Sequence, residues 1–142
     1  MIKWFQKKDN SDENEITTET AIACLLIYVA KIDGEYSQLE KKMIGLCLKK
    51  FLVKEETYIH NLILKSEKIE ENSVQIHHFT KKIKELDYEI RLKIIDMLLK
   101  IIYSDQELHE YEDNFIRRLA GLIYVEDKDI GSIKIALKQR LK

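Results

Sequence analysis

The chain has 142 residues, of which 45% are hydrophobic and 35% are charged, and this suits one domain with one buried core. The 24 basic and 25 acidic residues nearly cancel, so no overall positive field favours a nucleic acid as partner. Proline is absent and glycine occurs only four times, as long helices joined by short turns require. The composition therefore predicts an all-α fold and argues against nucleic-acid binding.

The first 16 residues differ in composition from the rest, so we predict an N-terminal segment and polar linker over 1–16 and a helical domain over 17–142. Trp4 and Phe5 lie among lysines and could insert into a membrane surface or a partner's groove. A short helix folded back on the domain, or a frayed end, is the alternative. The longest uncharged run is too short to cross a bilayer, and no signal-peptide pattern opens the chain. We therefore expect a cytoplasmic protein.

Apolar residues recur at helical spacing along the domain, and they predict six to seven helices in one compact bundle. The first helix should bury one stripe, and Thr17 or Thr18 can cap its start. Asp87 is a plausible cap for the fifth helix. The expected helices cover about 18–32, a second carrying 44–51, a third from after 54 to 71, a fourth over about 74–86, a fifth carrying 90–102, a sixth carrying 115–123 and a seventh from about 126.

An acidic segment occurs twice. The segment 33–40 reads Asp-Gly-Glu-Tyr-Ser-Gln-Leu-Glu, and 105–112, which begins 72 positions later, reads Asp-Gln-Glu-Leu-His-Glu-Tyr-Glu. Each copy follows one apolar stretch and precedes another, so the pattern predicts two pseudo-repeated helix-turn-helix units. Three acids keep their places in both copies: Asp33, Glu35 and Glu40 in the first, and Asp105, Glu107 and Glu112 in the second.

The first and last acids of each copy are expected to face inward. Extending the buried stripe of the first helix by one turn beyond Val29 leads to Asp33, and reading the second helix backwards from Ile44 leads to Glu40. The same continuation leads to Asp105 and Glu112 in the second copy. Carboxylates at a partly buried hairpin mouth need hydrogen bonds or cations, because removing water from an unpaired charge costs several kcal/mol.

Three arrangements would give these carboxylates the hydrogen bonds or cations that they need. Ser37 and Glu40 fit a capping box, but His109 stands in place of Ser37 in the second copy, so capping explains only the first. A divalent cation is the second, because all-oxygen ligands suit calcium or magnesium. The third is a network of salt bridges to basic residues such as Lys31, Arg117 or Arg118. All three remain open from the sequence.

The sequence Ala-Lys-Ile-Asp-Gly-Glu at 30–35, Glu40 after it, and Phe-Leu-Val closing the next helix at 51–53 resemble the tellurite-resistance protein B family, the TerB-like domain. The stretch 103–112 resembles that family's second acidic motif, although Gln106 replaces the family's glycine. The likeness covers about 18–128. It implies a helical bundle with pseudo-repeats, a cluster of the six acids named above, and a cytoplasmic role in tellurite resistance or general stress.

The resemblance also implies a binding or scaffold module with a possible metal link, and no established enzyme activity. The predicted function is therefore a non-enzymatic module that binds a divalent cation or a protein partner through its two acidic turns. A metal-dependent hydrolase that uses the same carboxylates is one alternative, because a bound ion can activate water. A peripheral membrane adaptor that uses Trp4 and Phe5 is the other.

Other reactive residues give weaker signals. Cys24 and Cys47 lie on two helices expected to pack together, so a thiol pair is conceivable, but buried thiols are usually inert. His77 and His78 are adjacent and diverge by about 100° on a helix, so we expect surface residues rather than a chelating pair. His109 could support the second acidic turn or be a solvent-exposed residue. No phosphate loop, nucleophile elbow or zinc-protease motif occurs.

Overall fold

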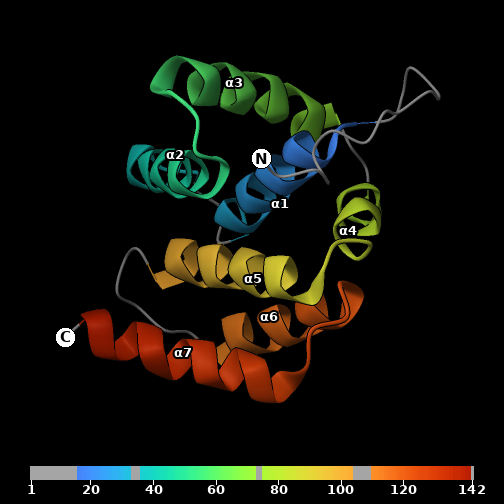
Figure 1. The fold of residues 1–142 in the computed structure, drawn as a ribbon, viewed down its shortest axis with the longest axis vertical. Helices are drawn as coiled ribbons and strands as arrows, with labels where there is room; N and C mark the ends of the chain where they lie inside the picture. Colours follow the sequence, from blue (N-terminus) through green and yellow to red (C-terminus); the bar gives the residue numbers. More distant parts are fainter. Residues whose placement is uncertain (1–15, 33–35, 73–74, 104–109, 142) are drawn as a thin grey trace.

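The computed structural model describes residues 16–32, 36–72, 75–103 and 110–141, with the side chains of 110–113 and 141 not described. These residues form seven helices and no strand, so the all-α prediction is confirmed for the described part of the chain (Figure 1). The helices are α1 (Thr18–Ala30), α2 (Gln38–Leu52), α3 (Glu56–Asn72), α4 (His77–Ile83), α5 (Tyr88–Ile102), α6 (Glu110–Leu122) and α7 (Asp127–Leu141).

Helix α1 is the centre of the bundle and packs against α2, α3, α4 and α5. The predicted single buried stripe is incomplete, because α1 is buried all round. Residues between the stripe positions, including Ala23, Cys24 and Ile27, are also fully buried. A helix surrounded by others needs apolar residues on every side, and the uncharged run 20–30 supplies them.

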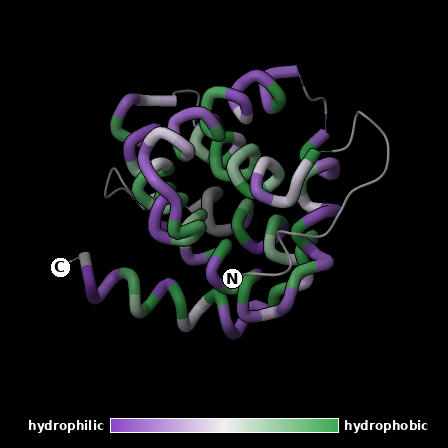
Figure 2. The backbone as a smooth tube through the Cα atoms, turned by 45° about the horizontal axis from the view of Figure 1, so that its top comes forward, coloured by the Kyte–Doolittle hydropathy of each residue, from purple (hydrophilic) through white to green (hydrophobic). Residues whose placement is uncertain are grey.

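The other helices cover α1 on several sides. In Figure 1, α3 lies on one side of α1 and α5 on the other, and α6 and α7 form a further layer beyond α5. Helix α2 packs against α1, α3 and α5, and α4 closes a remaining side of α1. Figure 2 shows hydrophobic and hydrophilic positions alternating along α7, the helix that ends at the C-terminus, as expected of a helix with one buried face.

Helix ends agree with the sequence prediction at two caps and differ at a third. Thr17 Oγ1 accepts a hydrogen bond from the backbone N–H of Thr20 at 3.2 Å, which caps α1. Asp87 occupies the N-cap position of α5, as predicted, but its side chain makes no capping bond. Its backbone carbonyl instead accepts bonds from Ile90 and Arg91 at 3.0 Å.

The helix boundaries keep the 72-residue offset of the acidic segments. Helix α1 ends at Ala30 and α5 at Ile102, while α2 begins at Gln38 and α6 at Glu110. The two turns themselves fall largely in 33–35 and 104–109, outside the described residues. The internal repeat therefore stays a prediction.

Arg91 makes a set of polar contacts between α5 and two of the neighbouring connections. Arg91 of α5 donates to the backbone carbonyls of Leu86, Ile123 and Tyr124 at 2.9, 3.0 and 2.9 Å. Its guanidinium also lies 5.1 Å from the ring centroid of Tyr88, within cation–π range. Arg91 thus joins the α4–α5 connection to the α6–α7 turn, and we call Arg91 and its three carbonyl acceptors the carbonyl joint.

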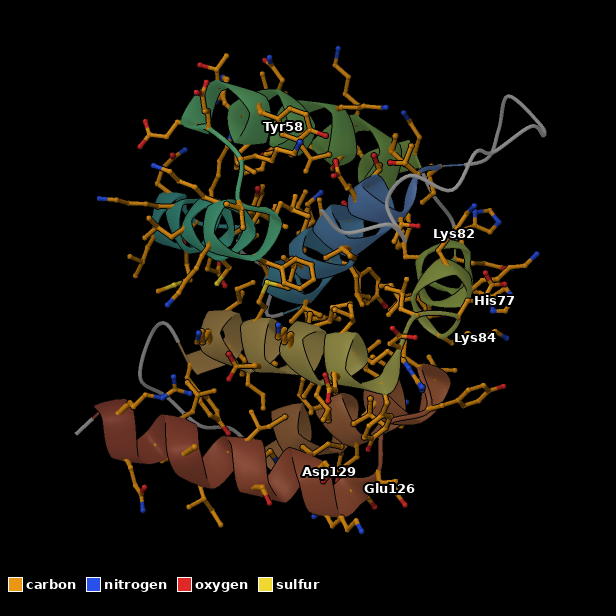
Figure 3. All side chains as sticks on the ribbon, viewed as in Figure 1. Tyr58, His77, Lys82, Lys84, Glu126 and Asp129 are labelled. Carbon is orange, nitrogen blue, oxygen red and sulfur yellow. The ribbon has the colours of Figure 1, made fainter. Side chains whose placement is uncertain are left out.

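The start of α7 is attached at the same place. The Tyr88 hydroxyl donates to the carboxylate of Asp129 and accepts from the backbone N–H of Glu126 at 3.2 Å. Figure 3 shows Glu126 and Asp129 at this end of α7. The α6–α7 turn is therefore held from both of its sides by residues of α5.

Candidate functional site around the first acidic turn

Most of the predicted site residues fall outside the described part of the chain. Asp33 and Glu35 of the first turn, and Asp105 and Glu107 of the second, lie in segments that the structure does not describe. Glu112 lies in α6, but its side chain is not described. Glu40 is the one predicted ligand whose side chain can be placed. Whether the two acidic turns meet in space therefore stays a prediction.

Glu40 completes the capping box predicted for the start of α2. The backbone N–H of Ser37 donates to Glu40 Oε1 at 2.9 Å, and Ser37 Oγ accepts from the backbone N–H of Glu40 at 3.1 Å. The Ser37 hydroxyl also lies 3.2 Å from Glu40 Oε1. One carboxylate oxygen of Glu40 is therefore used to hold the helix end.

Two carboxylates from α3 join the first turn. Glu70 Oε1 lies 2.6 Å from the ammonium of Lys31, and only 10% of the Glu70 side chain is exposed. Glu67 Oε2 accepts a hydrogen bond from the hydroxyl of Tyr36 at 2.8 Å and lies 3.1 Å from the ammonium of Lys41. We call these five residues the charged joint, because they attach the α1–α2 hairpin to α3.

Sequence reasoning missed Glu67 and Glu70, although a signal for them was present. Continuing the buried side of α3 beyond Ile59 and Ile63 by helical steps leads first to Glu67 and then to Glu70. The same continuation located Asp33 and Glu40 on the first two helices. Applied to α3, it would have placed two more acids at the same end of the hairpin.

The electrostatics of the charged joint centre on Tyr36. Burial raises the pKa of Tyr36 above the ordinary tyrosine value, and the bond to Glu67 and the negative charges of Glu67, Glu40 and Glu70 raise it further. The phenol is therefore held in its protonated, donating form. The ammonium of Lys31 lies 5.9 Å from the Tyr36 ring centroid, which adds a cation–π contact.

Salt bridges are present next to the first turn, but their carboxylates belong to α3, and most of the predicted pairs with the turn acids lie outside the described residues. Lys31 was a predicted partner for the acids of the turn, and it bonds Glu70 of α3. The other two predicted partners, Arg117 and Arg118, are exposed on α6. Within the described ranges, no group of three or more His, Cys, Asp or Glu side chains is arranged to hold a metal ion.

Comparison with known proteins supplies the family. The family model described as "Tellurite resistance protein TerB" matches residues 19–135, well over half of the chain. The chain belongs to the TerB family. Comparisons with curated proteins and with solved structures return no match. The span that matches the TerB model begins in α1 and ends in α7, so it contains the charged joint, both acidic segments and the carbonyl joint.

The two thiols of this TerB-family chain do not form the pair considered from the sequence. Cys24 Sγ donates to the backbone carbonyl of Ser66 on α3 at 3.5 Å, whereas Cys47 lies near Asp96 and Lys100 of α5. Both cysteines are free thiols. Burial raises the pKa of Cys24 to about 12, and it also raises the pKa of Cys47. Both groups are therefore neutral near pH 7 and poorly reactive.

Two further predictions concern the histidines of α4 and the ability of the helices to cross a membrane. His77 and His78 are exposed on α4, as predicted, and Figure 3 shows His77 on the outer side of that helix with Lys82 and Lys84 nearby. His109 lies outside the described residues. None of the helices formed by the described residues combines the length and the apolar character needed to cross a membrane.

Proposed function

We propose that this TerB-family chain is a non-enzymatic cytoplasmic module that binds a divalent cation through its two acidic turns. The observation that supports the proposal is the pairing within the charged joint. Lys31 and Lys41 flank the first turn in sequence, and both are already bonded to carboxylates of α3, at 2.6 and 3.1 Å. Asp33 and Glu35 lie between these two lysines in the sequence and carry two further negative charges, which we propose that an ion from solution balances.

The chemistry of the donors favours a hard cation. Carboxylate oxygens are the only ligands in the proposed set, and calcium and magnesium prefer oxygen. Calcium takes about six to eight oxygen ligands, more than one short turn offers, so we propose that both turns contribute. The residues that would hold the ion are Asp33, Glu35, Glu40, Asp105, Glu107 and Glu112.

A basic segment of a protein partner is the second candidate ligand for the same acids. The charged joint already binds two ammonium groups through carboxylates, and a partner's lysine would use the same chemistry. In either case the module acts by binding, and its role in tellurite resistance or stress follows from the ion or partner that it recruits.

The direct test is a calorimetric titration of the metal-free chain with calcium, magnesium, manganese and zinc. The double variant Asp33→Asn, Asp105→Asn removes one charge from each turn and keeps the side-chain size. Its matched control, Glu55→Gln, Glu85→Gln, removes two exposed charges elsewhere. We expect calcium or magnesium to bind the wild type and the control, with affinity reduced at least about tenfold in the acidic-turn variant.

Two results would contradict the cation proposal. One is the absence of binding for all four ions in the wild type. The other is an equal loss of affinity in the Glu55→Gln, Glu85→Gln control, which would show that binding depends only on total charge. Metal-dependent turnover of a phosphoester by the ion-loaded chain would instead support the hydrolase alternative.

A further inference from the structure

The outward face of α2 carries a second apolar stripe that the fold does not bury. Ile44, Leu48 and Leu52 form the buried side of the helix, which packs against α1, α3 and α5. On the opposite side Leu39 and Leu46 are 55% and 57% exposed, and Val53, the residue that ends the helix, is 80% exposed. Single exposed apolar side chains are ordinary on protein surfaces, but these three recur at every seventh position.

Seven-residue spacing places the three side chains in one line along the helix. Seven residues amount to about two turns, so each side chain lies within about 20° of the one before it. The seam between two packed helices uses two apolar positions in each seven-residue repeat, and residues at every seventh position supply one of these two. The outer face of α2, defined by Leu39, Leu46 and Val53, therefore has the pattern of a helix-packing surface.

Lysines border this stripe. Lys42, Lys49 and Lys50 are exposed on the same half of the helix, and Lys54 follows Val53. The whole chain carries a net charge of −1, so this concentration of positive charge is local to the surface around α2. In helix pairs, charges that flank an apolar seam select partners of opposite charge.

A hollow lies at the end of the stripe. It has a volume of about 750 Å³ and is lined by Leu46, Val53, three lysines, Glu55 of the α2–α3 connection and Glu56, the first residue of α3. Lys49 bonds Glu56 across it at 3.1 Å. The hollow offers an apolar wall to an inserted side chain and a mixed set of charges at its edge.

Val53 occupies a strained backbone position. Its φ of 55° and ψ of 54° place it in the left-handed region, which glycine adopts freely and β-branched residues avoid. A glycine there would end the helix with less strain. The chain instead places an apolar side chain, 80% exposed, at the edge of the hollow.

We propose that the outer face of α2 docks an amphipathic helix of a partner protein, with an apolar residue at every seventh position and acidic residues beside them. The lysines beside the stripe argue against a second copy of this chain as the docking partner, because two such positively charged faces would repel one another. A uniformly anionic membrane surface would meet Glu55 and Glu56 beside the hollow, whereas a helix can place a basic residue there. This proposal is independent of cation binding by the acidic turns.

The test uses a synthetic helix of three heptads with leucine at every seventh position and glutamates beside the leucines. One control peptide replaces the glutamates with lysines, and another has the same composition in scrambled order. Binding to the full chain is followed by fluorescence anisotropy. We expect saturable binding of the acidic peptide, weakened at least about tenfold in both controls.

Variants of the chain assign the binding to α2. Leu46→Gln and the pair Lys42→Glu, Lys50→Glu should each weaken binding at least about tenfold, since each removes seam or border contacts. The matched changes on α3, Leu64→Gln and the pair Lys65→Glu, Lys68→Glu, also alter exposed residues and should leave binding unchanged. Equal losses in the α3 variants would overturn the proposal.

Val53→Gly separates docking from folding. It relieves the left-handed backbone and should maintain or raise the melting temperature, while it weakens peptide binding by removing the exposed side chain. Lack of saturable binding by the acidic peptide, or equal binding of the scrambled one, would contradict the proposal. So would flotation with phosphatidylserine vesicles, or self-association, that Leu46→Gln abolishes, because either would assign another occupant.

Discussion

The charged joint and the carbonyl joint do the same structural task with different chemistry. In the first, lysines bond carboxylates, and Glu67 and Glu70 hold the α1–α2 hairpin on α3. In the second, Arg91 donates to three neutral backbone carbonyls and holds the α6–α7 turn on α5. The first contact pairs opposite full charges, which dissolved salt screens, whereas the second joins one charge to neutral carbonyls through a planar arginine fork. The stability that the charged joint contributes should therefore depend on salt concentration more than the contribution of the carbonyl joint.

The largest effect on stability is expected from breaking the carbonyl joint. Arg91→Ala removes three hydrogen bonds from a charged donor and leaves backbone carbonyls without that partner, so unfolding should become easier by about 2–4 kcal/mol. Arg91→Lys should recover only part of this, because an ammonium cannot reproduce the fork. Urea unfolding measures both, and the exposed Arg118→Ala is the control. A cost for Arg91→Ala no larger than that of Arg118→Ala would refute the structural role.

Breaking the charged joint should lower the free energy of unfolding by less than breaking the carbonyl joint does. The size of this loss should depend on salt concentration. Lys31→Met leaves Glu70, 10% exposed, without its ammonium partner, and should lower the free energy of unfolding by about 1–3 kcal/mol. Lys49→Met breaks the exposed pair with Glu56 and should cost no more than about 1 kcal/mol. Chemical unfolding at low and high sodium chloride concentration tests both. Equal losses of stability in Lys31→Met and Lys49→Met would contradict a stabilising role for the buried pair.

The difference in stability between the wild type and Tyr36→Phe should depend on pH. The hydroxyl bond to Glu67 should contribute about 1 kcal/mol near pH 8. Because burial and the nearby carboxylates raise the pKa of Tyr36, this contribution is fully present below the ordinary tyrosine pKa of about 10. It is lost as the pH rises further, since the unfolded chain then releases the proton that the folded chain keeps. The wild type and Tyr36→Phe should therefore converge in stability between pH 8 and pH 11, and a constant difference would count against this electrostatic picture.

The smallest effect on stability is expected at Ser66, the buried α3 residue that directly precedes Glu67. Its side chain is fully buried, and its hydroxyl has no hydrogen-bond partner among the described residues. Ser66→Ala removes a desolvated polar group, so the free energy of unfolding should stay within about 1 kcal/mol of the wild type or rise. Thermal unfolding measures the change, and a loss above about 2 kcal/mol would mean that the hydroxyl has a stabilising role.

The fold was accessible from the sequence because its signals are local. Periodic apolar residues located all seven helices, and Thr17 and Ser37 marked two helix starts correctly. The stripe predicted for α1 is buried, but it is only part of the buried surface, because periodicity shows which side of a helix must be apolar and does not show how many neighbours surround the helix. Asp87 takes the predicted N-cap position of α5 without a side-chain capping bond, because residue type alone does not fix a side-chain rotamer.

The candidate site was only partly accessible, because its contacts join residues far apart in the chain. The capping bond of Glu40 is local and could be predicted. Lys31 was matched to the acids nearest in sequence, but its carboxylate partner is Glu70, 39 positions away. Which α3 residue meets the hairpin depends on how the helices pack, and one sequence does not specify that packing.

The cation proposal is tested most directly by melting the metal-free chain with and without calcium or magnesium. An ion that binds only the folded chain stabilises it, and a concentration about 100 times the dissociation constant should raise the melting temperature by roughly 5–10 °C. We expect this rise for the wild type and for Glu55→Gln, Glu85→Gln, and its loss in Asp33→Asn, Asp105→Asn. An unchanged melting temperature in the wild type, or an equal rise in the acidic-turn variant, would contradict it.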